Sequence, residues 1–253
     1  MTLLTQIGGL VWVVNYGLYK LSGKKKSNWL KFSTFLILYI LITILLVPVL
    51  AKLNGRVPLP LTKSGIVRPH NTLMPLLNRN YVKPRLKTQL FKIGKIINAQ
   101  DKRLKVSYLD ANFPFIDGFP LLPHLSHDDG RKVDISFYYK KDGDVGNFKP
   151  SNSGYGIFVE PLASEIDQSA VCKSRGHWQY DYARYITLGS RNDLEFDDGQ
   201  TRKIIQLFVN DKTTHKIFIE PHLKKRMNLK SDKIRFQGCW SVRHDDHIHI
   251  SVY

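Results

Sequence analysis

Residues 32–50 form an uncharged run dominated by Leu, Ile, Val and Phe. At 1.5 Å per residue, a helix over this run would be about 28 Å long, close to the roughly 30 Å hydrocarbon core of a bilayer. A core helix of a soluble protein normally carries a polar face, and Ser33, Thr34 and Thr43 do not form one. The run therefore predicts a transmembrane helix over residues 31–51.

A second uncharged run covers residues 3–19, where several glycines and Asn15 weaken the apolar pattern. It is compatible with a second spanning helix or with a helix at the membrane interface. Lysines crowd the segment between the two runs, and short basic loops stay in the cytoplasm. We therefore expect a membrane anchor over residues 1–53, with everything after Ala51 on the far side of the membrane. A cleaved signal peptide fits poorly, because its basic residues would precede the apolar run.

The chain is strongly basic, with 38 Lys+Arg against 21 Asp+Glu, and no acidic residue precedes Asp101. Such a balance favours an anionic partner, namely nucleic acid, a membrane surface or an acidic polymer. The expected topology excludes nucleic acid, because the domain would lie outside the cytoplasm.

The two cysteines, Cys172 and Cys239, belong to no CxxC pair, which argues against a structural zinc knuckle. A disulfide and two buried free thiols both remain open.

Residues 54–69 are expected to be an extended linker, since Pro58 and Pro60 disfavour helix in the residues before them. The soluble domain would cover residues 70–253. Its periodicities predict helices over 83–99, 201–210 and 221–228. They predict strands over 105–109, 132–139, 156–159, 216–219 and 247–252, and loops over 110–123 and 160–182. Strands and helices that mix without strict alternation indicate an α+β fold.

Five of the nine histidines lie in two short stretches, residues 124–135 and 244–249. On a strand, His247 and His249 share one face, while Ile248 and Ile250 point into the core. Taken alone, such a pair fits surface histidines on an amphipathic strand better than a metal site.

His127 and Asp134 flank a turn that contains Gly130, which can bring an imidazole and a carboxylate together. Two imidazoles and one carboxylate are the protein ligands of a catalytic zinc site, which keeps a fourth position for water. The alternative for Asp134 is a buried strand carboxylate paired with Lys or Arg. Its place between Val133 and Ile135 favours the ligand interpretation.

The two stretches together resemble a known family. The pattern His-x-Ser-His-x-x-Gly-x-x-Val-Asp-Ile over residues 124–135, followed by His-x-x-His-x-His over residues 244–249, is similar to that of the penicillin-insensitive murein endopeptidases. These belong to the LAS group of zinc peptidases, with the lysostaphin-type enzymes, the D-Ala-D-Ala peptidases and the hedgehog N-terminal domains. The resemblance covers roughly residues 105–251 and implies a small antiparallel sheet with flanking helices and long loops.

By motif position, the resemblance makes His127, Asp134 and His249 the ligands of Zn²⁺. It makes His247 the catalytic histidine, which handles a proton or stabilises the tetrahedral intermediate. His124 and His244 match further family histidines that line the site. They would act either as transition-state partners or by orienting the ligands.

This sequence also departs from the family pattern. Ile250 follows the HxH pair where the family usually has a basic residue, and residues 236–243 form a longer segment. Asp245 and Asp246 add two carboxylates next to the catalytic pair, which we expect to influence substrate binding. The disulfides of the family do not map clearly onto the two cysteines.

Other candidate residues give weaker signals. His177 and Trp178 fit ordinary packing better than a groove lining, and Ser126 has no base–acid pattern around it and would orient its loop. The basic run at residues 224–226 reads as a solvated helix face.

The sequence thus predicts a membrane-anchored zinc peptidase that hydrolyses amide bonds in peptidoglycan peptide cross-links, as the resemblance implies. It would sit in the bacterial cytoplasmic membrane with its catalytic domain on the periplasmic or extracellular side. The alternative is a zinc-containing LAS-like module that binds a wall peptide or a protein partner without cleaving it, because this fold is not always a hydrolase.

Overall fold

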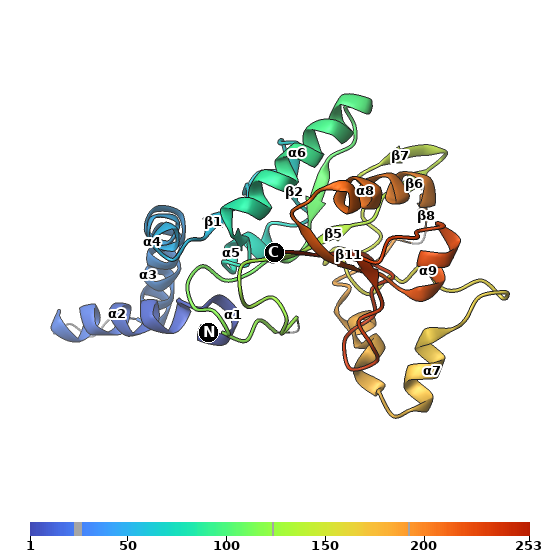
Figure 1. Cartoon of the computed structure of the whole chain (residues 1–253). Helices are drawn as coiled ribbons and strands as arrows, with labels where there is room; N and C mark the ends of the chain where they lie inside the picture. The colour runs from blue at the N-terminus through green and yellow to red at the C-terminus, as the bar shows by residue number, and fades with distance from the viewer. Residues whose placement is uncertain (23–26, 123, 192) are drawn as a thin grey trace.

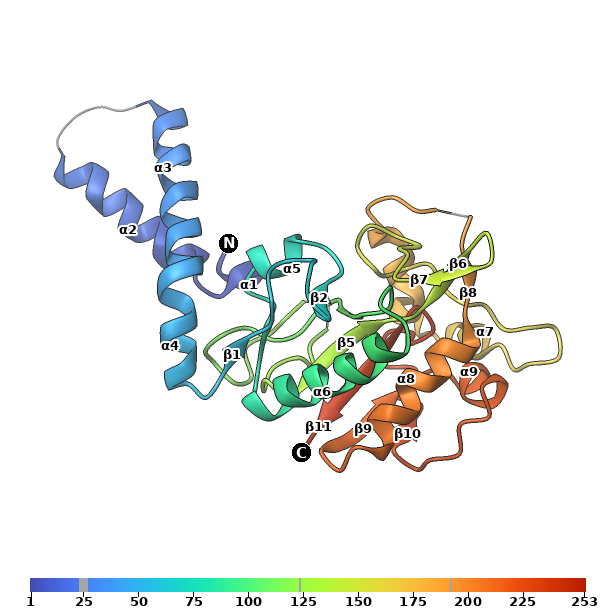
Figure 2. The same cartoon turned by 90° about the horizontal axis from the view of Figure 1, so that it is seen from above.

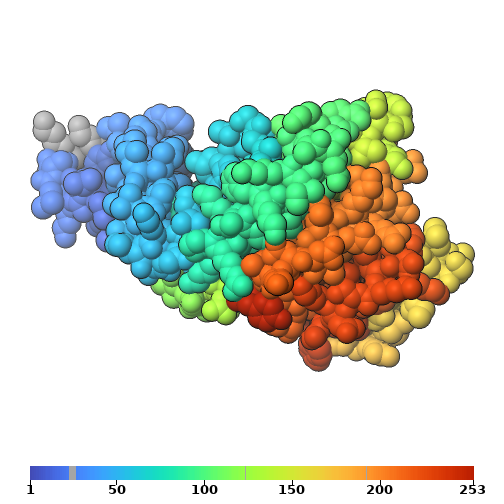
Figure 3. All heavy atoms as spheres, turned by 45° about the horizontal axis from the view of Figure 1, so that its top comes forward, coloured from blue at the N-terminus to red at the C-terminus, as the bar shows by residue number. Residues whose placement is uncertain are grey.

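The computed structural model describes residues 1–22, 27–122, 124–191 and 193–253. Figure 1 shows two parts, a group of N-terminal helices and a larger mixed α/β body. In the space-filling view the N-terminal helices project from one end of that body (Figure 3). The lysine-rich segment between the two apolar runs is described only in part, because residues 23–26 lie outside the described ranges.

The predicted transmembrane run lies in one continuous helix, Asn28–Leu53, of 26 residues. Among the described residues it is the one helix long and apolar enough to cross a membrane, and it would measure about 39 Å. The Ser27 side chain caps its start by accepting from Leu30 N. Near Pro48 the helix widens into a π-turn, since proline lacks an N–H and clashes with the carbonyl four residues earlier. The helix consists of α3 (Asn28–Leu41), η1 (Ile42–Leu46) and α4 (Val47–Leu53).

The first apolar run is broken at Gln6, whose φ of 64° lies in the left-handed region. The break separates α1 (Thr2–Thr5) from α2 (Gly8–Leu21). With 14 residues, α2 would be about 21 Å long, shorter than the hydrocarbon core. It packs against α3, where Asn15 Nδ2 donates to the Lys31 carbonyl at 3.0 Å. The N-terminal run is therefore a short helix lying against the longer one.

The centre of the body is a six-stranded sheet with the strand order β10-β9-β11-β5-β4-β2. The four central strands are antiparallel, as predicted, but both edge pairs, β2–β4 and β9–β10, are parallel. Parallel neighbours need a crossover, and α6 and α9 lie in the connections between these pairs. The sheet is therefore mixed. Its strands are β2 (Val67–Pro69), β4 (Val106–Tyr108), β5 (Lys132–Ser136), β9 (Thr214–Phe218), β10 (Ile234–Arg235) and β11 (His247–Val252).

Two helices, α6 (Pro84–Gln100) and α8 (Asp198–Asn210), cover one face of this sheet, as Figure 2 shows. The predicted apolar stripe of α6 is buried there and includes Leu86 and Ile93. Ile248 and Ile250 of β11 belong to the same core. The core thus occupies one face of the sheet, which leaves the side chains of the other face for the site. The remaining helices outside the anchor are α5 (Leu73–Leu76), α7 (Gln168–Ser174), η2 (Trp178–Ile186) and α9 (Pro221–Arg226).

Residues 54–69, expected to be a linker, pack against the body in part: residues 54–55 and 61–64 are exposed, whereas two short strands are paired. β1 (Val57–Pro58) pairs with β3 (Tyr81–Val82), and β2 is the outermost strand of the main sheet. An edge strand tolerates Pro69, because proline removes a donor from the ladder. The sheet therefore begins at Val67 rather than beyond His70.

Three further expectations for residues 132–196 need correction. The strand predicted over 132–139 ends at Ser136, and Tyr139 begins a separate sheet of order β7-β6-β8. Residues 160–182 are not one long loop, because α7 and the start of η2 lie within them. The Asp167 side chain caps α7 by accepting from Ala170 N at 2.9 Å. Residues 156–159 form no strand. The strands of the smaller sheet are β6 (Tyr139–Lys141), β7 (Asp144–Gly146) and β8 (Glu195–Phe196).

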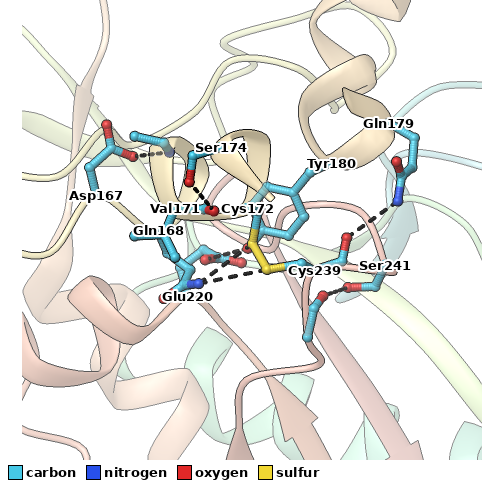
Figure 4. Close-up of a disulfide and its surroundings, with 12 residues drawn as sticks. Asp167, Gln168, Val171, Cys172, Ser174, Gln179, Tyr180, Glu220, Cys239 and Ser241 are labelled. Atoms are coloured by element: carbon cyan, nitrogen blue, oxygen red, sulfur yellow. Dashed lines mark hydrogen bonds between the residues drawn. A yellow bond between two sulfur atoms is a disulfide. The ribbon is translucent and has the colours of Figure 1, made fainter. Parts of the chain in front are cut away.

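A disulfide joins Cys172 of α7 to Cys239, with the two Cα atoms 5.3 Å apart (Figure 4). The two cysteines are 67 residues apart in the sequence. Of the two states that the sequence left open, a disulfide and two free thiols, the structure has the disulfide. The bridge fixes α7 to the segment that leads into β11.

Candidate metal centre

Two neighbouring central strands supply three of the site residues. His249 of β11 lies directly opposite Asp134 of β5 in the antiparallel ladder, and His247 lies opposite Ser136. Directly opposed side chains project from the same face of a sheet, and so do residues two apart on one strand. Asp134, His247 and His249 therefore share the face that points away from the core, as the alternating pattern predicts.

His127 reaches this face from the loop before β5. Its Nδ1–H donates to the Ala111 carbonyl at 2.8 Å, which leaves Nε2 to face the strands. Nε2 lies 3.2 Å from Asp134 Oδ1 and 3.1 Å from His249 Nδ1. The remaining side of this triangle, from His249 Nδ1 to Asp134 Oδ1, measures 3.0 Å. Ligands about 2.0–2.1 Å from a tetrahedral metal would be roughly 3.3 Å apart, so the triangle is close to that of a metal site.

His124 approaches the same carboxylate from its other side. Its Nδ1 lies 3.2 Å from Asp134 Oδ2 and 3.2 Å from Asp110 Oδ2. His124, His127 and Asp134 are all buried, and ligand atoms from the three lie within 4.8 Å of one another. This group can bind a metal ion. His127 and Asp134 are thus shared by two possible ligand sets, which differ in whether His124 or His249 is the third member.

A tyrosine that sequence reasoning missed completes the surroundings of Asp134. Tyr155 is 3% exposed, and its hydroxyl donates to Asp134 Oδ2 at 2.8 Å. Burial, followed by the charge of Asp134, raises the pKa of Tyr155 well above its usual value, so the hydroxyl remains a donor. Gly154 and Gly156 flank it with φ of +92° and +84°, and a Cβ at Gly156 would lie 2.2 Å from the Ala183 carbonyl oxygen. This glycine pair is the signal that marks the tight turn presenting Tyr155.

The environment keeps the Asp134 carboxylate ionised. Burial alone would raise its pKa, but the imidazoles around it, first of all His127, hold that pKa well below the usual range. An ionised carboxylate is the form that binds a metal. Burial lowers the pKa of His249 to about 4, which keeps this imidazole neutral and able to act as a ligand.

His247 has a different electrostatic environment from His249. Its Nδ1 donates to Asp246 Oδ1, and Gly156 N donates to Asp246 Oδ2 at 2.6 Å. Burial opposes the charged form, but the carboxylates of Asp134 and Asp246 raise the pKa of His247 to about 9. Among the described residues, its Nε2 is buried without a hydrogen-bond partner. Of the two His247 nitrogens, Nε2 is therefore the one available to a substrate or a water molecule.

The His244 ring lies beside the rings of both β11 histidines, at centroid distances of 4.9 Å from His247 and 5.6 Å from His249. Its backbone N–H donates to Glu220 Oε1 at 3.1 Å. The Tyr180 hydroxyl donates to Glu220 Oε2 at 2.7 Å. Burial and the two neighbouring imidazoles hold the pKa of His244 well below its usual value. The structure thus places all six predicted site residues around one point.

The two additional carboxylates support the site rather than line it. Asp245 is fully buried and pairs with Arg243, which also bonds Glu160 and lies over the Phe158 ring at 3.9 Å. Asp246 holds His247. Neither carboxylate lines the cleft, contrary to the expectation that they act on a substrate directly. Their contacts instead hold the start of β11 in position.

The site opens into a cleft of about 500 Å³. Ser126, expected to orient its loop, lies on the cleft wall. The basic run at residues 224–226, expected to be a solvated helix face, is partly structural, because Arg226 bonds Glu165 and Lys224 bonds the Ile234 carbonyl. The described residues that line the cleft are Leu122, His124, Leu125, Ser126, Asp134, Gln179, Tyr182, Gln237, Trp240, Ser241, Val242, His244, His247 and His249.

Two comparisons with known proteins find no relative of this chain. No protein-family model matches the chain. A search of curated proteins likewise finds no significant match. The assignment of a function therefore depends on the geometry and chemistry of the cleft itself.

Proposed function

We propose that this chain is a membrane-anchored zinc peptidase that hydrolyses amide bonds in the peptide cross-links of peptidoglycan. The observation that carries the proposal is the triangle of His127 Nε2, Asp134 Oδ1 and His249 Nδ1, with sides of 3.0–3.2 Å. Asp134 and His249 of this triangle line an open cleft. Two imidazoles and one carboxylate form the ligand set of a hydrolytic zinc site. In such sites zinc supplies activation of water and polarisation of the scissile carbonyl.

His249 is the better third ligand than His124. Its Nδ1 completes the tight triangle, and its low pKa keeps it neutral. The Nδ1 of His124 instead lies between the carboxylates of Asp110 and Asp134. Asp110 in turn binds Arg79, whose Nε donates to Asp110 Oδ1 at 3.0 Å. These contacts hold His124 beside the triangle of ligand atoms, without making it one of the three ligands.

His247 is the proposed proton carrier. Asp246 fixes its Nδ1 as a donor, so Nε2 is the atom that exchanges a proton in the cleft. With its pKa raised to about 9, His247 carries this proton at neutral pH, so it can give the proton to the leaving amine and regain one from the water that adds to the carbonyl. His124 and His244 lie on either side of it, with ring centroids 6.0 Å and 4.9 Å from the His247 ring. Their role would be to stabilise charge that develops on the substrate carbonyl.

The proposed location is the bacterial cytoplasmic membrane, with the cleft on the periplasmic or extracellular side. Helix Asn28–Leu53 is long enough to cross the bilayer. The Cys172–Cys239 disulfide supports an oxidising compartment for the domain. The basic segment before the helix supports a cytoplasmic start. The substrate class, and a LAS-type fold for the body, follow from the resemblance of the two histidine stretches to the murein endopeptidases.

The test is digestion of purified peptidoglycan by the full-length protein in detergent, with mass spectrometry of the products. We expect new amine ends on the cross-links and about one zinc per chain. His247→Ala should retain the metal and lose turnover, while His215→Ala, on strand β9 and outside the cleft lining, should retain both. Undigested peptidoglycan that still binds the protein would favour the non-catalytic module, and a folded protein that takes up no metal would refute the site.

A further inference from the structure

The segment at residues 236–243, which leads into β11, places an exposed tryptophan at the edge of the cleft. Trp240 is 85% exposed and belongs to the cleft lining. Leu122 and Leu125 of the same lining are exposed as well, and large apolar side chains that gather at a cleft mark a ligand-binding surface. Both neighbours of Trp240 in the sequence are tied down.

Several contacts hold the Trp240 backbone in place. Cys239 is bonded to Cys172, and its carbonyl accepts from Gln179 Nε2 at 3.4 Å (Figure 4). The Ser241 hydroxyl donates to the Gly238 carbonyl at 2.8 Å and closes the turn. The ring of Trp240 itself meets His177 edge-on, at a centroid distance of 4.5 Å. The tryptophan is therefore presented in a fixed orientation, which lowers the entropy lost when a ligand binds.

The surrounding lining shows what kind of ligand fits. This chain has 38 Lys and Arg residues, yet none of the described residues that line the cleft is Lys or Arg. Asp134, the candidate ligand, is the one acidic residue among them. Beyond the histidines, Trp240 is accompanied by amides, hydroxyls and aliphatic side chains, including Gln179, Gln237 and Ser241. An anionic polymer would find no Lys or Arg partner along this lining, whereas an uncharged sugar needs an apolar ring face and neutral hydrogen-bonding groups.

We infer that the Trp240 edge of the cleft is a saccharide subsite, where the indole face stacks on a sugar ring of the glycan strand that carries the cleaved peptide. The inference rests on the proposed function and extends it from the peptide to the glycan. Gln179, Gln237 and Ser241 would bond the hydroxyl and amide groups at the edge of the sugar. The subsite and the metal centre line one cleft, so a single substrate can occupy both.

The test uses a peptide-free N-acetylglucosamine oligomer as the probe. Binding is measured by calorimetry on the full-length protein, in a detergent whose headgroup is not a sugar. An aromatic stacking contact predicts that Trp240→Ala weakens binding about three- to tenfold. The matched control is Trp178→Ala, because Trp178 is 78% exposed on the neighbouring segment but does not line the cleft. This control should bind like the wild type.

A second comparison separates this inference from the proposed function. On cross-linked fragments, Trp240→Ala should raise KM more for substrates that carry glycan than for glycan-free peptide dimers. The double variant Cys172→Ser/Cys239→Ser should also weaken oligomer binding. Equal binding by wild type, Trp240→Ala and Trp178→Ala would overturn the subsite, even if peptide dimers are cleaved. Oligomer binding that depends on Trp240, without any hydrolysis, would keep the subsite and refute the peptidase.

Discussion

Tyr155→Phe removes one hydroxyl from the candidate metal centre and leaves its shape almost unchanged. The hydroxyl donates to Asp134 Oδ2 at 2.8 Å, and both side chains are buried. A hydrogen bond to a charged group contributes about 1.5–3 kcal/mol. Because the neighbouring imidazoles keep Asp134 ionised without a metal, this bond stabilises the metal-free protein too. We therefore expect the free energy of unfolding of the metal-free protein to fall by about 1.5–3 kcal/mol.

The metal affinity should fall by a smaller free energy. The bond exists with and without metal, so its contribution partly cancels when the metal binds. The part that does not cancel is the effect of the hydroxyl on the orientation of Asp134 Oδ1 toward His127 and His249. Residues that hydrogen-bond a metal ligand typically contribute 10- to 100-fold to metal affinity. We expect the lower end, about a tenfold weaker affinity.

Competition with a chelator of known affinity measures this value, and denaturant unfolding in the same detergent measures stability. The control is Tyr108→Phe, which removes a partly buried hydroxyl bond of 2.7 Å to the Pro60 carbonyl. Tyr108→Phe should destabilise the protein without altering metal affinity. If Tyr155→Phe binds metal as tightly as the wild type, or if Tyr108→Phe weakens binding equally, the argument for Tyr155 fails.

Three further predictions concern the ligand set, the pH dependence and the disulfide. His249→Ala should abolish metal uptake, whereas His124→Ala should retain about one metal per chain, as metal analysis of the purified variants would show. Burial lowers the pKa of His70 to about 3 from 6.5, so the unfolded state gains a proton first as the pH falls. Stability should therefore fall below pH 6.5 by up to about 1.4 kcal/mol per pH unit, and His70→Gln should flatten this slope in unfolding experiments. Cys172→Ser/Cys239→Ser should lower the free energy of unfolding by about 2–5 kcal/mol, measured against the oxidised wild type.

The features that the sequence predicted correctly follow from a regular residue pattern within a single helix or strand. The alternation at β11 placed His247 and His249 on one face and Ile248 on the other, and the pairing with β5 confirms it. The apolar stripe of α6 and the uncharged run of the long helix are local in the same sense. Each follows from spacing along one element, so no knowledge of the rest of the fold was needed.

The features that were missed depend on contacts between distant segments. Tyr155 reaches Asp134 from a loop without periodicity, and Arg79 meets Asp110 across 31 residues. The edge strand β2 has only three residues, too few for an alternating pattern to be recognised. Cys172 and Cys239 gave no spacing signal, because their pairing depends on where α7 packs. Only the tertiary fold determines such pairings.

The position of β11 links the chemistry of the site to the stability of the body. β11 lies between β9 and β5, so its outward histidines and its buried isoleucines depend on the same backbone ladder. A metal held by His127, Asp134 and His249 would join a loop to two central strands across 122 residues of sequence. An ion that binds only this folded arrangement stabilises it by about 2.7 kcal/mol at a hundred times its Kd. A chelator should therefore lower the stability of the whole sheet as well as remove activity, and His249→Ala should abolish this sensitivity.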